Sequence, residues 1–211
     1  MPQSRYEEIL KNIQHLEQQL TQEIEDIIAK KREQFQYSLK RGKVTFNRET
    51  RKFHKLHRTG LFSYLKQSNA SYILTAPIIY SGIFPLIILD IFVFIYQQTC
   101  FRVYGIPLVS RNDYLIIDRQ HLNYLNIIEK FNCIYCGYGN GLIAYVREIF
   151  ARTEQFWCPI KHAKRNADTH RYEHHFTDYG DVHAYEQKLA SLRNDLRNLQ
   201  KNTEKNKSNH E

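Results

Sequence analysis

The longest apolar run of the chain extends from Tyr72 to Tyr96 and has the sequence YILTAPIIYSGIFPLIILDIFVFIY. These 25 residues carry a single charge, on Asp90. About 20 apolar residues are enough to cross the hydrocarbon layer of a bilayer, and a buried core helix is rarely this long and this apolar. The pattern therefore predicts a membrane segment over residues 71–99.

Two prolines, Pro77 and Pro85, interrupt this run, and Gly82 lies between them. Because proline removes a backbone donor and bends a helix, the segment is either one crossing helix, which we favour, or a re-entrant hairpin. Five Lys and Arg residues occupy the 20 positions before position 71, against two in the 20 positions after position 96. By the positive-inside rule, the N-terminal region is cytoplasmic. A crossing puts the cysteines on the oxidising side, whereas a hairpin leaves them in the cytosol.

Residues 1–70 show two amphipathic helical patterns, with a break at Gly42. In the first, apolar residues recur at three- and four-residue spacing, as in a surface helix or a coiled-coil strand: Ile9, Ile13, Leu16, Leu20 and Ile27. In the second, an apolar face accompanies a cationic one, which is typical of a helix on a membrane surface; the cations are Arg48, Arg51, Lys52, Lys55 and Arg58.

Residues 100–165 predict a helical hairpin that contains the Cys and His residues. One apolar face comprises Leu122, Leu125, Ile128 and Phe131, and a second comprises Leu142, Val146, Ile149 and Phe150. The segment CGYGNG, with three glycines in five residues, is expected to break the helix between them.

The C-terminal part predicts a polar connection over 166–181, an amphipathic helix over 182–201 and a disordered tail over 202–211. The helix has leucines at coiled-coil spacing, so its expected partner is the N-terminal helix or a second copy of the chain. The fold class is therefore mainly α: a single membrane-inserted helix or re-entrant hairpin, flanked by amphipathic helices and followed by a C-terminal helical hairpin.

The charge balance supports membrane lipid as a partner. The chain has 30 Lys and Arg against 22 Asp and Glu, which favours anionic lipid or nucleic acid. Before Ala70 there are 14 basic and 8 acidic residues, but 16 and 13 after Tyr96, so the excess precedes the apolar run. This distribution favours lipid and makes nucleic acid the weaker alternative. Residues 1–20 lack the apolar core of a cleavable signal.

Four residues form a candidate metal set: Cys133, Cys136, Cys158 and His162. Three thiolates and an imidazole suit tetrahedral zinc, and a closed set of four indicates a structural site. One unbroken helix from 141 to 156 would span about 24 Å, so shared coordination needs a bent helix, a chain that folds back, or ligands from two subunits. A redox or disulfide pair at Cys133 and Cys136, or plain buried thiols, are the alternatives.

Asp90 is the costly residue of the apolar run, because a carboxylate inside a bilayer must pair, neutralise or reach the interface. One interpretation is a proton or ion relay. The other is a carboxylate that is hydrated or bonded to a neighbour.

Three segments carry a resemblance to a family of uncharacterised proteobacterial membrane proteins: EQFQYSLKRGKV, LTAPIIYSGIFPLIILDIFVFIYQQTCF and DRQHLNYLNIIEKFNCIYCGYGNGLIAYVREIFARTEQFWCPIKHAKR. The resemblance covers roughly residues 33–199 and is most specific in the CGYGNG and RTEQFWCPIKH parts. It implies a bacterial inner-membrane location and adds weight to the Cys and His set, but it implies no activity.

No residue set specifies a reaction, and catalytic residues are not assigned. The sequence favours a membrane-anchored scaffold or accessory protein with a structural metal site, which binds a partner or a second copy through its terminal helices. The alternative is a membrane-bound thiol redox or metal-handling enzyme that uses the C-x-x-C pair.

Overall fold

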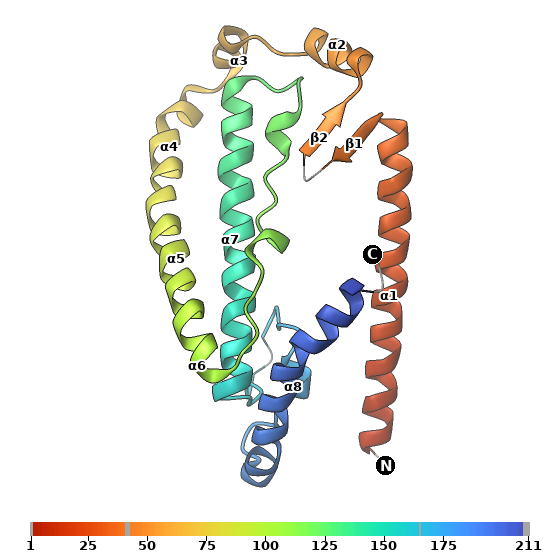
Figure 1. Ribbon diagram of the computed structural model, residues 1–211. Coiled ribbons are helices and arrows are strands. Elements are labelled where there is room, and N and C mark those ends of the chain that lie inside the picture. The colour runs from red at the N-terminus through yellow and green to blue at the C-terminus, as the bar shows by residue number, and fades with distance from the viewer. Residues whose placement is uncertain (1, 41–42, 165, 209–211) are drawn as a thin grey trace. The chain divides into compact units, whose positions relative to one another are not determined.

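The computed structural model describes residues 2–40, 43–164 and 166–208 (Figure 1). The fold is mainly helical, as predicted. The chain forms two compact units, the first from Met1–Lys66 and Asp118–Lys130, the second from Gln67–Ile117 and Phe131–Glu211. The break expected at Gly42 and the last three residues of the expected tail lie outside the described residues.

The first unit begins with the long helix α1 (Pro2–Gln34). The strands β1 (Tyr37–Lys40) and β2 (Lys43–Phe46) follow as an antiparallel pair, with Tyr37 opposite Phe46. This pair was not predicted from the sequence. The unit also contains α2 (Arg48–Leu56), most of α3 (Leu61–Gln67) and the short turn η3 (Arg119–His121).

Aromatic contacts hold α2 against the strands. Phe46 is buried, and its ring packs edge-on against His54 at 4.9 Å between centroids. His54 in turn packs edge-on against Tyr124 at 5.1 Å. The apolar stripe of α1 stays exposed, for example at Leu16 and Leu20, so coiled-coil pairing of this helix remains a prediction.

The apolar run of the second unit is one continuous helix from Ala70 to Tyr104. It comprises α4 (Ala70–Ser81), α5 (Ile83–Tyr96), the π-helical turn η1 (Gln97–Phe101) and α6 (Arg102–Tyr104). The chain does not turn back at Pro77–Pro85, so the re-entrant hairpin inside this run is wrong. Pro85 lies in the first turn of α5, where a missing N–H costs little. Gly105, with φ of 68°, ends the helix.

Helix α7 (Ile127–Trp157) runs parallel to α4 and α5. Tyr80 donates a hydrogen bond to Asn132, and Tyr138 donates one to Asp90. The residue numbers rise together along both helices, so the helices point the same way (Figure 1). The return segment, which we define as residues 105–117, must therefore run back past α5; it contains the turn η2 (Arg111–Asp113).

The predicted helical hairpin is wrong, because α7 continues through CGYGNG without a break. The glycines make room for the return segment instead of forming a turn. A Cβ placed on Gly141 would lie 2.7 Å from the carbonyl oxygen of Tyr114 and 3.0 Å from the Cα of Leu115. Position 141 therefore has no room for a side chain, because the backbone of the return segment packs directly on the backbone of α7.

The chain after α7 forms a polar connection with one short turn, η4 (Glu173–His175), and then helix α8 (Val182–Ser208). The disordered tail predicted from residue 202 is wrong as far as Ser208, because α8 continues through these Lys, Glu and Asn residues without a Pro or Gly to stop it.

The apolar stripe of α8 packs inside its own unit. Leu196 is fully buried in a core cluster that also contains Val93, Phe101, Leu142 and Ile149. The buried leucines are therefore covered within this unit, and pairing of this helix with the N-terminal helix or a second copy stays a prediction. The core lies where α5, α7 and α8 of the second unit meet.

Candidate functional site

Helix α5 has two faces of different chemistry. On the outward side, seven large apolar side chains are 43–68% exposed: Phe84, Ile87, Ile88, Ile91, Phe92, Phe94 and Ile95. We call these seven residues the outer face of α5. The inward side chains include Val93, which is fully buried, and Leu86 and Leu89, which pack on the core.

The apolar exposure continues along α4. Leu74 is 79% exposed and Ile78 is 74% exposed. In the most apolar 18-residue window of the Ala70–Tyr104 helix the mean hydropathy is 2.5, and only 6% of the window is buried. The helix is thus long and apolar enough to cross a membrane, and soluble monomers rarely expose continuous apolar patches beyond a few hundred Å².

Asp90 points to the protein side of α5. Its carboxylate accepts hydrogen bonds from Arg111 at 2.6 and 3.3 Å and from the Tyr138 hydroxyl at 3.0 Å. Asp90 thus forms an ion pair with Arg111 of the return segment. This confirms the interpretation in which the carboxylate is bonded to a neighbour. Neither Arg111 nor Tyr138 was singled out by the sequence, because neither shares a periodic pattern with Asp90.

Gln97, which is buried, continues this polar line at the C-terminal end of α5. Its side chain accepts from the backbone N–H of Val109 at 3.1 Å and donates to the Tyr145 hydroxyl. The hydroxyl group of the preceding residue, Tyr96, is 3.1 Å from that of Thr153. The one charged group of α5 therefore faces the protein, whereas its exposed side is apolar, the reverse of a water-soluble surface helix.

A second polar cluster lies toward the end of α7, around the buried carboxylate of Glu148. Glu148 accepts hydrogen bonds from Arg152 at 2.8 Å, Arg171 at 2.5 Å and the Tyr172 hydroxyl at 2.6 Å. Burial alone would raise the pKa of Glu148, but the hydrogen bonds from Tyr172 and Arg152 and the charge of Arg171 outweigh it and lower the pKa. The cluster ties the polar connection to α7.

The four predicted metal ligands are not brought together in one chain. Cys133 and Cys136 lie in the first part of α7, whereas Cys158 and His162 follow its last residue, Trp157. The helix between Cys136 and Trp157 is about 30 Å long at roughly 1.5 Å per residue. Among the described residues, no group of three or more His, Cys, Asp or Glu side chains could hold a metal ion.

All four cysteines are free thiols. Burial and the nearby Glu154 carboxylate raise the pKa of the Cys158 thiol, which lowers its thiolate fraction and its reactivity at neutral pH. Zinc binding by ligands from two subunits, and redox cycling of Cys133 and Cys136, stay predictions.

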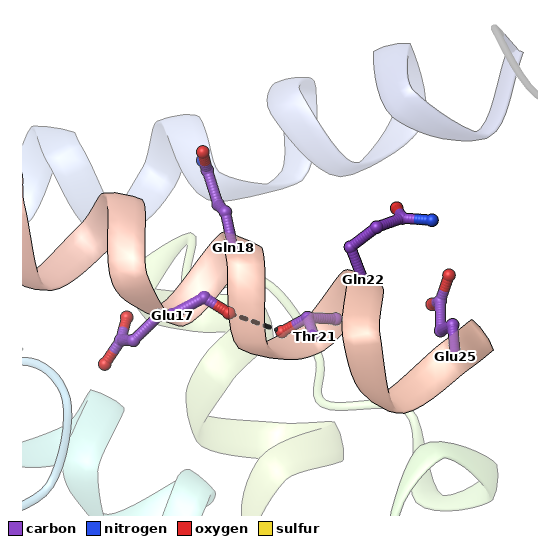
Figure 2. Close-up of a pocket in the computed structure, with 5 residues that line it drawn as sticks. All are labelled: Glu17, Gln18, Thr21, Gln22 and Glu25. Atoms are coloured by element: carbon purple, nitrogen blue, oxygen red, sulfur yellow. Dashed lines mark hydrogen bonds between the residues drawn. The ribbon is translucent and has the colours of Figure 1, made fainter. Parts of the chain in front are cut away.

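A shallow pocket lies on α1 and is lined by five of its side chains (Figure 2): Glu17, Gln18, Thr21, Gln22 and Glu25. All five are exposed, and Thr21 donates a hydrogen bond to the carbonyl of Glu17 at 2.7 Å. Side chains of a single exposed helix do not enclose a ligand, so the pocket contributes no chemistry. The outer face of α5 is therefore the main candidate for function.

Comparisons with protein-family models, curated proteins and solved structures found no match for this chain.

Proposed function

We propose that this chain is a membrane-bound scaffold or accessory protein that holds itself in lipid by the outer face of α5. The observation that carries the proposal is the exposure of the seven large apolar side chains of the outer face, on a helix that turns Asp90 and Gln97 to the protein. Lipid tails are the covering that suits such a surface, because polar groups of membrane helices face the protein interior.

The surroundings of Asp90 favour a helix that lies along one leaflet over a helix that crosses. Arg111, next to Asp90, has a side chain that is 45% exposed, and Asp113 is exposed in the same segment. In a crossing protein these charges would lie at the depth of Asp90, and the return segment would be non-helical chain inside the bilayer, where such chain must be buried in protein. A helix that lies in the plane of the interface, with its apolar side about 5–10 Å deep, keeps these charges and the non-helical return segment out of the hydrocarbon layer.

This orientation replaces the crossing favoured by the sequence and keeps both ends of the chain on one side. The basic excess before Ala70 favours the cytoplasmic leaflet, whose surface is anionic, at the inner membrane of a bacterium in keeping with the family resemblance. The thiols then lie in a reducing compartment. The exposed stripe of α1 around Leu16 and Leu20 supports the scaffold role, because such a helix can dock on a protein groove or on a second copy.

Fractionation of cells that express the full chain tests the proposal. The variant replaces Ile88 and Ile91, which lie on the outer face of α5, with lysine. Burying one isoleucine side chain in apolar surroundings contributes about 1.5–3 kcal/mol, and the lysines that replace them carry charge, so the double variant is expected to move from the membrane pellet to the soluble fraction. The wild-type chain is expected to resist alkaline washing and to be released by detergent.

The matched control replaces Tyr179 and Val182, which are 71% and 63% exposed outside this helix, with lysine. It is expected to stay in the pellet with the wild type. A wild-type chain in the soluble fraction would refute membrane attachment. A variant at Ile88 and Ile91 that pellets as fully as the control would refute the role of the outer face.

A further inference from the structure

Helix α2 presents a second outward surface, in the first unit. Its inner side is fixed by His54 on Phe46 and by Arg51, whose Nε donates to the Phe46 carbonyl at 3.1 Å. The opposite side exposes Leu56 (83%) and Phe53 (59%). The Asn47 side chain caps this helix by accepting from the backbone N–H of Thr50 at 2.7 Å, which sets the direction of both sides.

The apolar exposure extends into α3, where Phe62 is 89% exposed. Basic side chains are interleaved with these apolar ones. Between positions 48 and 66 six residues are basic and one, Glu49, is acidic. We define the cationic apolar surface as the exposed basic and large apolar side chains of this stretch, without the inner Arg51: Arg48, Lys52, Phe53, Lys55, Leu56, Arg58, Leu61, Phe62, Leu65 and Lys66.

We propose that the cationic apolar surface binds the anionic headgroups of the membrane in which α5 is held. This inference rests on the proposed function and adds the class of lipid. Phe53, Leu56 and Phe62 enter the interface between headgroups and tails, while lysine and arginine side chains extend to the phosphates. The surface ends at Lys66, four residues before Ala70, where the exposed apolar helix begins.

The apolar side chains favour lipid over nucleic acid as the occupant. A groove for RNA or DNA aligns cations along a phosphate backbone and uses aromatic side chains to stack bases. Here the two most exposed apolar side chains are Leu56 and Phe62. Leucine cannot stack on a base, but it partitions well into the upper part of a bilayer. Each Lys or Arg near an anionic leaflet adds about fivefold to the partition coefficient.

Flotation of the full chain, diluted from mild detergent, with two kinds of vesicle tests the inference. Neutral phosphatidylcholine vesicles report the apolar contribution of α5. Vesicles that also contain phosphatidylglycerol report the anionic increment. Replacing Lys52 and Lys55 with glutamine is expected to lower partitioning to anionic vesicles about 25-fold and to leave partitioning to neutral vesicles unchanged. Raising salt from 0.1 to 1 M shortens the screening length from about 10 to about 3 Å and is expected to remove the increment.

The control replaces Lys164 and Lys188, two exposed lysines of the second unit, with glutamine and is expected to change neither value by more than about twofold. Equal wild-type binding to both vesicles would overturn this inference and leave the proposed function standing. Equal losses in the two variants would overturn it as well. Binding to neither vesicle would refute the proposed function itself, and removal of the chain from anionic vesicles by RNA through the same two lysines would show a nucleic-acid surface instead.

Discussion

Two glycines of α7, four residues apart, allow a test of how the return segment packs. Gly141 is buried, and a Cβ there would lie 2.7 Å from the Tyr114 carbonyl oxygen, an approach that requires backbone to move. A Cβ on Gly137 would lie 3.6 Å from the carbonyl oxygen of Ile116, an ordinary contact. Alanine at the two positions is therefore the same chemical change with opposite consequences.

The magnitudes follow from two competing effects. Glycine to alanine inside a helix stabilises it by up to about 1 kcal/mol. Forcing a methyl group into a packed interior costs about 1–3 kcal/mol. Gly137→Ala gains the first effect and avoids the second, so it is expected to be stabilising by up to about 1 kcal/mol. For Gly141→Ala the second effect dominates, and we expect net destabilisation of about 1–2 kcal/mol.

Thermal unfolding in detergent, followed by circular dichroism, measures the difference. For a chain of this size, 1 kcal/mol shifts Tm by about 2–4 °C. Gly141→Ala is expected to lower Tm by about 2–8 °C, and Gly137→Ala is expected to leave it unchanged or to raise it by about 2–4 °C. If Gly141→Ala unfolds at the same temperature as Gly137→Ala or higher, the return segment does not pack on α7 as described.

Three further predictions concern the polar contacts. Glu148→Gln is expected to destabilise the fold by about 3 kcal/mol, because two arginines lose their carboxylate. Since the pKa of Glu148 is lowered in the folded state, the full loss is expected above the ordinary glutamate pKa of 4.5 and a smaller loss at lower pH. A loss of stability that does not depend on pH would contradict the ion cluster. Asp90→Asn and Arg111→Gln are expected to cost about 1 kcal/mol each and less than the sum together, and additive melting shifts would exclude their pairing. Glu154→Gln is expected to lower the pKa of the Cys158 thiol and to speed its alkylation by iodoacetamide at pH 8, and an unchanged rate would count against the influence of this carboxylate.

The elements that the sequence predicted best are those with strong local patterns. The apolar run around Ile88 predicted a long helix because nearly every position agrees. The glycines of CGYGNG misled the prediction, because each costs a helix only about 1 kcal/mol, which packing of the Tyr114 backbone on Gly141 outweighs. No local pattern shows that packing, since the contacting residues are far apart in the chain.

The same contrast between local patterns and distant contacts explains which site residues could be predicted. The stripe containing Leu196 could be found from spacing, but its partner could not, because a helix face does not specify what covers it. Asp90 was recognised as costly, yet Arg111 was missed, since it lies 21 residues away in an irregular segment. Helix length alone correctly raised the objection to a shared metal site for Cys136 and Cys158.

Accessibility of spin labels along the outer face of α5 tests membrane attachment most directly. In a cysteine-free background, single labels at Phe84, Ile88, Ile91 and Ile95 are measured in vesicles against oxygen, which enters lipid, and a nickel chelate, which stays in water. We predict high oxygen access and low nickel access at all four, with similar depth for a helix along one leaflet. High nickel access at these positions would contradict the lipid-facing surface, and a depth profile that peaks at the middle positions would show a crossing helix instead.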